Sequence, residues 1–206
     1  MAFQISDFTT RLTGDGARPN LFQVSIPNIP TGQNAPGANP AAGSSSTSLS
    51  FLAKAAQLPG STLGTVPMYY FGREVKFAGN RTFADWTITI VNDENFIIRN
   101  SIEAWMNYIN SNQGNLRGTS VQSNNFTTTQ ALGYTSDAHV YQYAKTGGAD
   151  GLAGAIKAYD FVGMFPVDLS PIDLDWGSND TIEEFTVTFA YQYLSLIHIS
   201  EPTRPY

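Results

Sequence analysis

The chain contains no cysteine among its 206 residues. This excludes a disulfide framework, a thiolate nucleophile and a cysteine-ligated metal. The first residues, MAFQISDFTTRL, carry an acid and no apolar core of signal-peptide length. No run approaches the ~18 apolar residues that are needed to span a bilayer. We therefore expect a protein without membrane association that is made and kept in a cytoplasm.

Charged residues are also scarce. They make up 14% of the chain, whereas about 25% is usual in a soluble domain. The net charge is −6, and no cluster of Lys or Arg exceeds two neighbours. A protein that grips nucleic acid needs a basic stripe to displace counterions from phosphates, so we do not expect tight DNA binding, although DNA could pass without sticking. A surface with so few charges is one that another protein could cover. The alternative interpretation is an ordinary solvent-exposed surface that is neutral because it is rich in Ser, Thr and Asn.

Side chains suited to catalysis or metal binding are few. Apart from the last residues, His139 is the one histidine, and its place in a strand-like run favours a structural role. The segment 173–184 gathers possible oxygen ligands for Ca²⁺, namely Asp173, Asp175, Asn179, Asp180 and Glu183. Its glycine falls at the wrong place for an EF-hand loop and no helices flank it, so a turn that satisfies its own backbone is the better interpretation. We predict no catalytic residue, no metal and no cofactor, and hence no enzyme.

What the chain does contain is strand-forming sequence. Aromatic residues reach 13%, and Thr and Val accompany them in the apolar runs. Trp86, Ile88 and Ile90 alternate with threonines, which predicts a strand whose apolar face lies in the core, near Trp105. A tight corner at 78–80 is expected just before it. The strand-like segments are 20–26, 65–79 with a kink at Gly72, 86–91, 137–145, 156–169 and 182–193.

One helix is predicted, beginning at Asn92 or Asp93 and running to about Asn110. Its apolar stripe follows the helical period and consists of Ile98, Ile102, Trp105, Met106 and Ile109. Asp93 and Glu94 would lie in the first turn, where the helix dipole favours acids. With about seven strands that are mostly neighbours in sequence, antiparallel pairing is expected.

We interpret residues 1–193 as one domain with two long loops. Residues 31–48 contain no large apolar side chain and are read as a flexible insertion in a hairpin, and residues 112–135 as a polar surface loop. Residues 194–206 abandon the alternation and look like a translated sequencing adapter. We predict that the residues from about Leu196, or already from Leu194, are not native and carry no function. A genuine disordered tail is the alternative, and in either case this segment is excluded from the fold.

Three blocks carry a family resemblance: ARPNLFQV at 17–24, AGNRTFADWTITIVNDE at 78–94 and LDWGSNDTIEEFTVTFAYQY at 174–193. With them the chain resembles the major tail tube proteins of contractile-tailed bacteriophages. The family-motif and structural positions are Arg18, Pro19, Asn20, Gly79, Arg81, Phe83, Asp85, Trp86, Asn92, Asp93, Glu94, Trp105, Asp175 and Trp176. Two features depart from the family: the 31–48 loop is longer, and Leu194-Ser195 replaces the usual Trp-Glu.

The resemblance implies a mainly β (α+β) fold of two packed antiparallel sheets, or a split β-barrel, with one flanking α-helix. It implies hexameric rings in which each subunit lends strands to a continuous barrel, stacked into an inner tail tube that conducts phage DNA into the host. The implied partners are further copies of the chain, the sheath protein, baseplate and tail terminator proteins, and the tape measure protein in the lumen. The implied location is the virion tail, after assembly in the host cytoplasm, and the family brings no catalytic residue or cofactor.

The physical logic agrees with this interpretation. Long strands with open edges expose unpaired N–H and C=O groups, and pairing with copies of the same chain removes those edges. The alternative function is the inner tube of a phage-derived contractile secretion or injection system. A third class, a carbohydrate-binding or hydrolytic β-sandwich, predicts a monomer with sugar-dependent stability.

Overall fold

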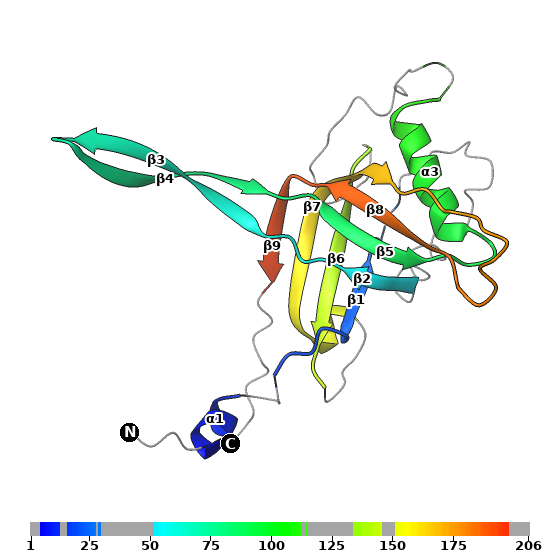
Figure 1. The fold of residues 1–206 in the computed structure, drawn as a ribbon, viewed down its shortest axis with the longest axis horizontal. Coiled ribbons are helices and arrows are strands. Elements are labelled where there is room, and N and C mark those ends of the chain that lie inside the picture. The colour runs from blue at the N-terminus through cyan, green and yellow to red at the C-terminus, as the bar shows by residue number, and fades with distance from the viewer. Residues whose placement is uncertain are drawn as a thin grey trace.

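The computed structural model describes residues 5–12, 16–27, 29, 52–112, 114, 134–145 and 151–197. The predicted loop 31–48 and nearly all of 112–135 lie outside these residues. The described part is mainly β with few helices, as predicted (Figure 1). Its elements are α1 Ile5–Arg11, β1 Phe22–Ser25, β2 Ala53–Ala56, β3 Ser61–Tyr70, β4 Arg73–Phe83, β5 Trp86–Val91, α3 Ile97–Ile109, β6 Ser136–Tyr143, the 3₁₀ turn η3 Gly151–Gly154, β7 Ala155–Leu169, β8 Glu184–Ala190 and β9 Tyr193–Ile197.

Seven strands form one antiparallel sheet in the order β1-β6-β7-β8-β5-β2, with β9 also paired to β7. The 15-residue strand β7 belongs to two sets of strands. Its first part pairs with β6 and β9, and residues 165–169 pair with β8. Near this change of partner, the Gly163 amide donates to the carboxylate of Asp137 at 3.0 Å. In Figure 1 the strands β5 and β8 cross in front of β6 and β7.

The core lies between these two sets of strands and α3. Trp86 of β5 stacks on Phe161 of β7, with ring centroids 4.2 Å apart, and Trp105 of α3 lies 6.1 Å from Phe189 of β8. The predicted packing of two antiparallel sheets with a flanking helix is thus present as two sets of strands joined through β7. The largest fully buried side chains are Trp86, Trp105, Phe161, Phe185, Phe189, Ile26, Ile88, Ile90, Ile98, Ile102 and Met164.

The single strand predicted over 65–79 is wrong. The chain turns at Phe71 and Gly72, so β3 and β4 form a hairpin that is a separate two-stranded sheet. The predicted corner at 78–80 is also wrong, because β4 continues through these residues to Phe83. Both errors have one cause. Alternation predicts extended backbone, but it does not show where the chain reverses unless the turn residues are typical ones.

The helix α3 begins later than predicted. It starts at Ile97, so Asp93 and Glu94 precede it instead of occupying its first turn. Asp93 still serves the helix start, because its carboxylate accepts a hydrogen bond from the Ile97 amide at 3.2 Å. The predicted apolar stripe is confirmed: Ile98, Ile102 and Trp105 are buried, and the other two members pack against the core.

Both ends of the described chain differ from the predictions. The short helix α1 was not expected, although Ile5, Phe8 and Leu12 follow the helical spacing i, i+3 and i+7. The predicted strand 182–193 stops at Ala190, and after a bend at Gln192 the chain enters β9, which pairs with β7. The prediction that the fold ends at 193 is therefore wrong for residues 194–197, which complete β9. Residues 198–206 lie outside the described residues.

Candidate assembly surfaces

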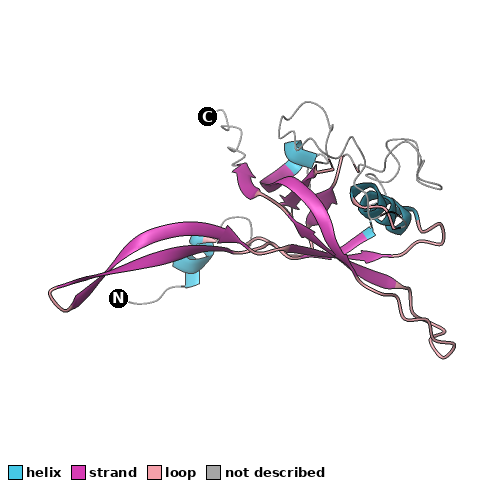
Figure 2. Ribbon diagram, turned by 90° about the horizontal axis from the view of Figure 1, so that it is seen from above, coloured by secondary structure: helices cyan, strands magenta, loops and turns pink. Residues whose placement is uncertain are grey.

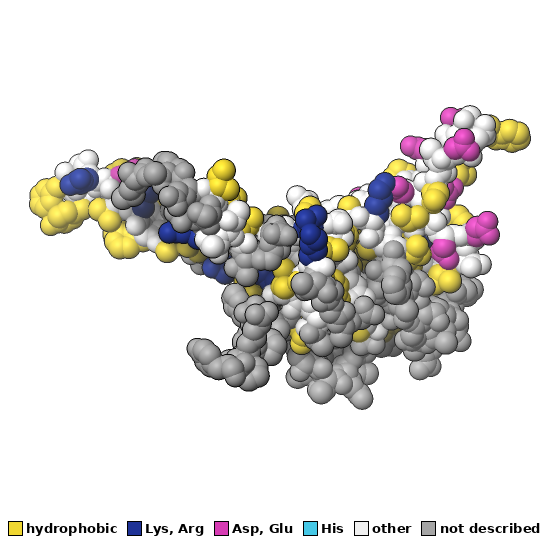
Figure 3. Space-filling view, turned by 90° about the horizontal axis from the view of Figure 1, so that it is seen from below, with side chains coloured by type: hydrophobic (Ala, Val, Ile, Leu, Met, Phe, Trp, Pro, Cys, Tyr) yellow, Lys and Arg dark blue, Asp and Glu magenta, His cyan; other side chains and the backbone are white. Residues whose placement is uncertain are grey.

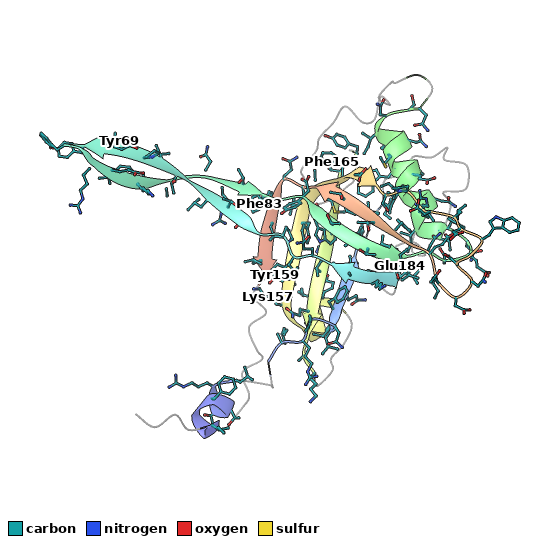
Figure 4. All side chains as sticks on the ribbon, in the orientation of Figure 1. Tyr69, Phe83, Lys157, Tyr159, Phe165 and Glu184 are labelled. Atoms are coloured by element: carbon teal, nitrogen blue, oxygen red, sulfur yellow. The ribbon has the colours of Figure 1, made fainter. Side chains whose placement is uncertain are left out.

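The hairpin of β3 and β4, residues 61–83, projects away from the sheet as an arm (Figures 1 and 2). Its residues are exposed except Gly79 and Phe83. Figure 4 shows Tyr69 near the tip of the arm and Phe83 at its base. An isolated two-stranded sheet is at best marginally stable in water. The arm is therefore an element that needs further contacts.

One face of the arm is apolar. The register places Val66 opposite Phe77, Met68 opposite Val75, and Tyr70 opposite Arg73. Opposed residues share a face of the ribbon, so these five apolar side chains lie together. Their exposed fractions run from 43% for Val75 to 70% for Tyr70, and Figure 3 shows hydrophobic side chains along the arm. A continuous apolar surface of this kind marks a site of protein contact.

The tip of the arm is strained. Phe71 has φ 47° and Gly72 has φ 78°, so both central residues of this two-residue turn have positive φ. A turn of this kind is normally built from Asn-Gly or Asp-Gly, and an aromatic residue in the left-handed region costs about 1–3 kcal/mol. Phe71 is also 91% exposed. Its ring makes an edge-on contact with the adjacent Tyr70 ring, with centroids 4.5 Å apart, and is otherwise exposed, which points to a contact outside the isolated chain.

Gly79 fits a close approach within the arm. A Cβ built there would lie 3.0 Å from the Gly64 carbonyl oxygen on the facing strand. The register shifts between Leu63 and Thr65, so the two strands are irregular at this point. A side chain at residue 79 would force the backbones apart. The predicted motif position Gly79 thus has a steric explanation.

The segment 170–184, which joins β7 to β8, forms a second exposed surface that we call the acidic loop. Trp176 is 101% exposed, Leu174 82% and Ile182 73%. As the turn interpretation predicts, the Asp175 carboxylate accepts a hydrogen bond from the Gly177 amide at 3.1 Å. The segment has no Lys or Arg, and its acids are Asp173, Asp175, Asp180, Glu183 and Glu184.

The sheet also has open edges. Strands β1, β2 and β9 each pair with one neighbour among the described strands. Such edges offer backbone N–H and C=O groups to another chain. At β2 the edge carries Lys54, whose Nζ lies 2.5 Å from the Glu184 carboxylate of β8. Sequence alternation did not identify these edges, because it does not specify strand order.

The predicted motif positions do not form one site. Trp86 and Trp105 are in the core, where the Trp105 indole N–H donates to the Tyr134 carbonyl at 2.6 Å. Asn92 lies between β5 and α3 and contacts the acidic loop. Its side-chain amide donates a hydrogen bond to the Glu183 carboxylate at 2.9 Å.

The remaining motif positions are distributed over the surface. Arg18, Pro19 and Asn20 form an exposed turn in which the Leu21 amide donates to the Arg18 carbonyl at 3.3 Å. Arg81 is exposed on β4, and Phe83 packs against Tyr191 at 5.8 Å. The others, Asp85, Glu94, Asp175 and Trp176, are exposed. The family motifs did not include the apolar residues of the arm. A search for two alternating runs on either side of Phe71-Gly72 could have found them.

His139 does have a carboxylate neighbour, which sequence spacing did not supply. Its Nδ1 lies 2.7 Å from Asp160 Oδ1, because the two residues are register partners on β6 and β7. The Tyr141 ring stacks beside the imidazole with centroids 6.0 Å apart. The contact with Asp160 ties β6 to β7, in keeping with the structural role predicted for His139. In the described part of the chain, no three His, Cys, Asp or Glu side chains are placed to hold a metal ion.

Two tyrosines have a raised pKa. Burial, and secondarily the Asp85 carboxylate, raise the pKa of Tyr191. Burial also raises the pKa of Tyr141, with added contributions from the Asp160 carboxylate and the Tyr143 phenol. The Tyr191 hydroxyl is buried and has no hydrogen-bond partner among the described residues.

No helix in the described segments has the length and apolar character needed to cross a bilayer.

Comparison with known proteins places these surfaces in context. A family model described as phage tail tube protein matches residues 17–196. The tail tube protein gp19 of Enterobacteria phage T4 is 33% identical over 181 residues, which cover 88% of this chain and 92% of that protein. The family match spans both the arm and the acidic loop.

Two solved structures share the fold. The tube-terminating cap of the anti-feeding prophage matches with a TM-score of 0.57 at 13% identity, over 97% of this chain and 95% of that chain. A chain from the sheath–tube complex of an extracellular contractile injection system matches with a TM-score of 0.51 at 14% identity, over 96% of this chain and 100% of that chain. At this identity they support the architecture and no more.

Proposed function

The chain belongs to the phage tail tube protein family, and from this membership we propose that it is the inner-tube subunit of a contractile tail. In this proposal the protein polymerises as stacked hexameric rings, and the rings form the channel through which phage DNA enters the host. The role is structural, and we assign no catalytic residue and no cofactor.

The exposed apolar face of the arm is the observation that carries the proposal. Five large apolar side chains on a two-stranded sheet remain in contact with water in the isolated chain. Covering them contributes roughly 25 cal/mol for each Å² of apolar surface removed from water. A protein that works alone has no reason to keep such an element, whereas a subunit of a polymer does.

Ring formation is supported by the open edges of the sheet. Among the described residues, the end strands β1, β2 and β9 each have one edge that is not paired with another strand. Cyclic symmetry can supply the missing neighbour to every copy at once, so that strands from several subunits complete one barrel. Contacts between different surfaces of successive rings then repeat along the axis and generate a tube. Hexameric closure is the form that family membership favours.

A tail tube has defined neighbours, and we propose that this chain has them too. These are the tail sheath protein around the tube, baseplate and tail terminator proteins at its ends, and the tape measure protein in its lumen. These proposed neighbours rest on membership of the tail tube family. The protein would assemble in the host cytoplasm and end in the virion tail, without membrane association.

The charge balance suits passage of DNA. The net charge is −6, and duplex DNA carries one negative charge per ~1.7 Å of its axis. A wall with few cations releases no counterions from the phosphates, so it does not retain the duplex. We propose transient, non-specific passage of double-stranded DNA.

The alternative function is the inner tube of a phage-derived injection device. The observation that favours this alternative is the fold shared with the anti-feeding prophage cap and with the contractile injection system, at 13% and 14% identity. The phage relative is 33% identical over nearly its full length. The sequence similarity therefore favours the phage tail. Neighbouring genes for virion proteins would support this choice, and neighbouring effector genes would contradict it.

Negative-stain electron microscopy of the purified full chain tests the proposal. Rings or tubes with a central channel are expected at concentrations from the micromolar range upward. The same sample is compared with and without oligosaccharides in a thermal melt. Featureless single particles at every concentration would contradict the tube, and a melting temperature raised by sugar would favour the β-sandwich class instead.

A further inference from the structure

Opposite charges gather on the arm and the acidic loop. The arm carries Arg73, Lys76 and Arg81 with Glu74 as its single acid, a net charge of +2. Residues 170–184 carry five acids and no base, a net charge of −5. Within a chain whose charge is otherwise sparse, two segments of opposite sign are unusual and call for a physical reason.

These two surfaces lie at opposite ends of the molecule. The arm extends to one side in Figure 1, and the connection between β7 and β8 extends to the other, beside α3. Figure 3 shows Lys and Arg with hydrophobic side chains along the arm, and acidic with hydrophobic side chains at the far end. Because of this separation, the arm and the acidic loop of one molecule cannot meet.

The charged groups are available for an intermolecular contact. Arg73, Arg81, Asp173 and Asp180 are exposed, and among the described residues none of them has an ion-pair partner. In the described part of the chain, the ion-pair partner of Lys76 is its strand neighbour Glu74, at 3.9 Å. Exposed pairs of that length contribute little, so Lys76 can exchange partners.

We propose that the arm of one subunit binds the acidic loop of a second copy of this chain. The inference rests on the proposed function and names the receptor for the arm within the polymer. Phe71 and the apolar face of the arm cover Leu174, Trp176 and Ile182 of the second copy. Arg73, which shares this face, pairs with Asp173 and Asp180 at the margin of this contact, and Lys76 on the opposite face adds positive charge beside it.

The physical argument combines area and charge. Each surface exposes large apolar side chains beside charges of one sign, and the signs are complementary, so the contact satisfies both requirements at once. Charge complementarity also provides direction. An arm repels another arm and an acidic loop repels another acidic loop, so only a head-to-tail contact remains, and a heterologous contact of that kind generates rings or filaments.

The test is a charge exchange in the full chain. One variant reverses the arm (Arg73→Glu with Lys76→Glu), a second reverses the loop (Asp173→Lys with Asp180→Lys), and a third carries all four changes. Each two-residue variant should need about tenfold or more protein for half-maximal assembly in sedimentation, because like charges then face each other. The four-residue variant should recover assembly. An equimolar mixture of the first two variants should also assemble, since the reversed arm meets the reversed loop.

The controls separate this inference from the proposed function. Asp168→Lys, which changes an exposed acid on β7 outside the acidic loop, should assemble like the unchanged chain. Circular dichroism and thermal melts check that every variant is folded. If the unchanged chain forms no rings or tubes, the proposed function fails. If it assembles and the reversed variants assemble equally well, or if neither the mixture nor the four-residue variant recovers, this inference alone is overturned.

Discussion

Trp86 is the side chain at which the two sets of strands meet. It is fully buried, stacks on Phe161 at 4.2 Å and lies 5.7 Å from Phe189. Its indole N–H has no hydrogen-bond partner among the described residues. Trp86 therefore stabilises the fold by its apolar area and its ring contacts, without a polar contribution.

Replacing Trp86 should measure that packing. Trp86→Ala is expected to lower the free energy of unfolding by ~3–5 kcal/mol, because it leaves a large cavity between the strands. Trp86→Phe keeps an aromatic ring and removes the unpaired N–H, so it should cost distinctly less. Urea unfolding followed by circular dichroism gives both values. An unchanged melting temperature in Trp86→Ala would reject this placement in the core.

A second prediction at this scale concerns alkaline stability. The pKa of Tyr191 is raised in the folded chain, whereas an unfolded tyrosine titrates near pH ~10. The folded state therefore holds the phenol proton at a pH where the unfolded state releases it. This contribution to stability is complete below about pH 10 and is lost as the pH rises through the folded-state pKa.

Tyr191→Phe isolates the effect. At about pH 8 the variant should be as stable as the unchanged chain or more so, because the buried hydroxyl makes no hydrogen bond with the described residues. Above about pH 10 it should lose less stability with rising pH. Unfolding by urea at a series of pH values measures the slope. An equal slope in both proteins would show that Tyr191 does not control this dependence.

At the scale of the element, the arm is separable from the core. It forms its own sheet, and its side chains are exposed as far as the base, where Phe83 packs on Tyr191. Its cost to the isolated chain includes the strained turn at Phe71. Retention of such an element is best explained by contacts in the polymer.

Excision of the arm tests this separation. Thr65 and Ala78 are register partners, so replacing residues 66–77 with Asn-Gly closes the hairpin with a turn that suits two strands. The variant should fold with a stability within about 1 kcal/mol of the unchanged chain, since no buried contact is removed. It should no longer assemble. Circular dichroism and analytical ultracentrifugation read out the two properties, and tubes formed by the variant would show that the arm is dispensable.

At the scale of the whole molecule, stability and assembly are coupled. A subunit that binds copies of itself only when folded is stabilised by mass action. The large exposed apolar surface of the arm and acidic loop makes this coupling strong. The midpoint of thermal unfolding should therefore depend on protein concentration.

This dependence can be measured directly. Each tenfold rise in concentration should raise the apparent melting temperature by about 3–6 °C, because roughly 1.4 kcal/mol of association free energy is added and a domain of this size shifts about 2–4 °C per kcal/mol. The arm-excised variant is the matched control and should melt at one temperature at all concentrations. A concentration-independent midpoint for the unchanged chain would mean that no association accompanies folding.

The sequence alone determined which side chains form the core. The alternation of Trp86, Ile88 and Ile90 and the stripe of Ile98, Ile102 and Trp105 were read correctly, because burial repeats with the period of the local backbone. The motifs also identified the family. These properties depend on residues near one another in the chain, so one sequence contains them.

Only the tertiary structure decided how the strands are arranged. The run from Phe185 to Tyr193 alternates without a break, yet the chain bends at Gln192, whose amide donates to the Val162 carbonyl at 3.0 Å. Likewise, the residues around Phe71 read as one strand and form a hairpin. Alternation is the same on both sides of a bend, and strand order depends on distant partners. The arm and the open edges were therefore visible only once the chain was folded. The acidic loop was predicted as a turn from the sequence, and the structure added that its apolar side chains are exposed.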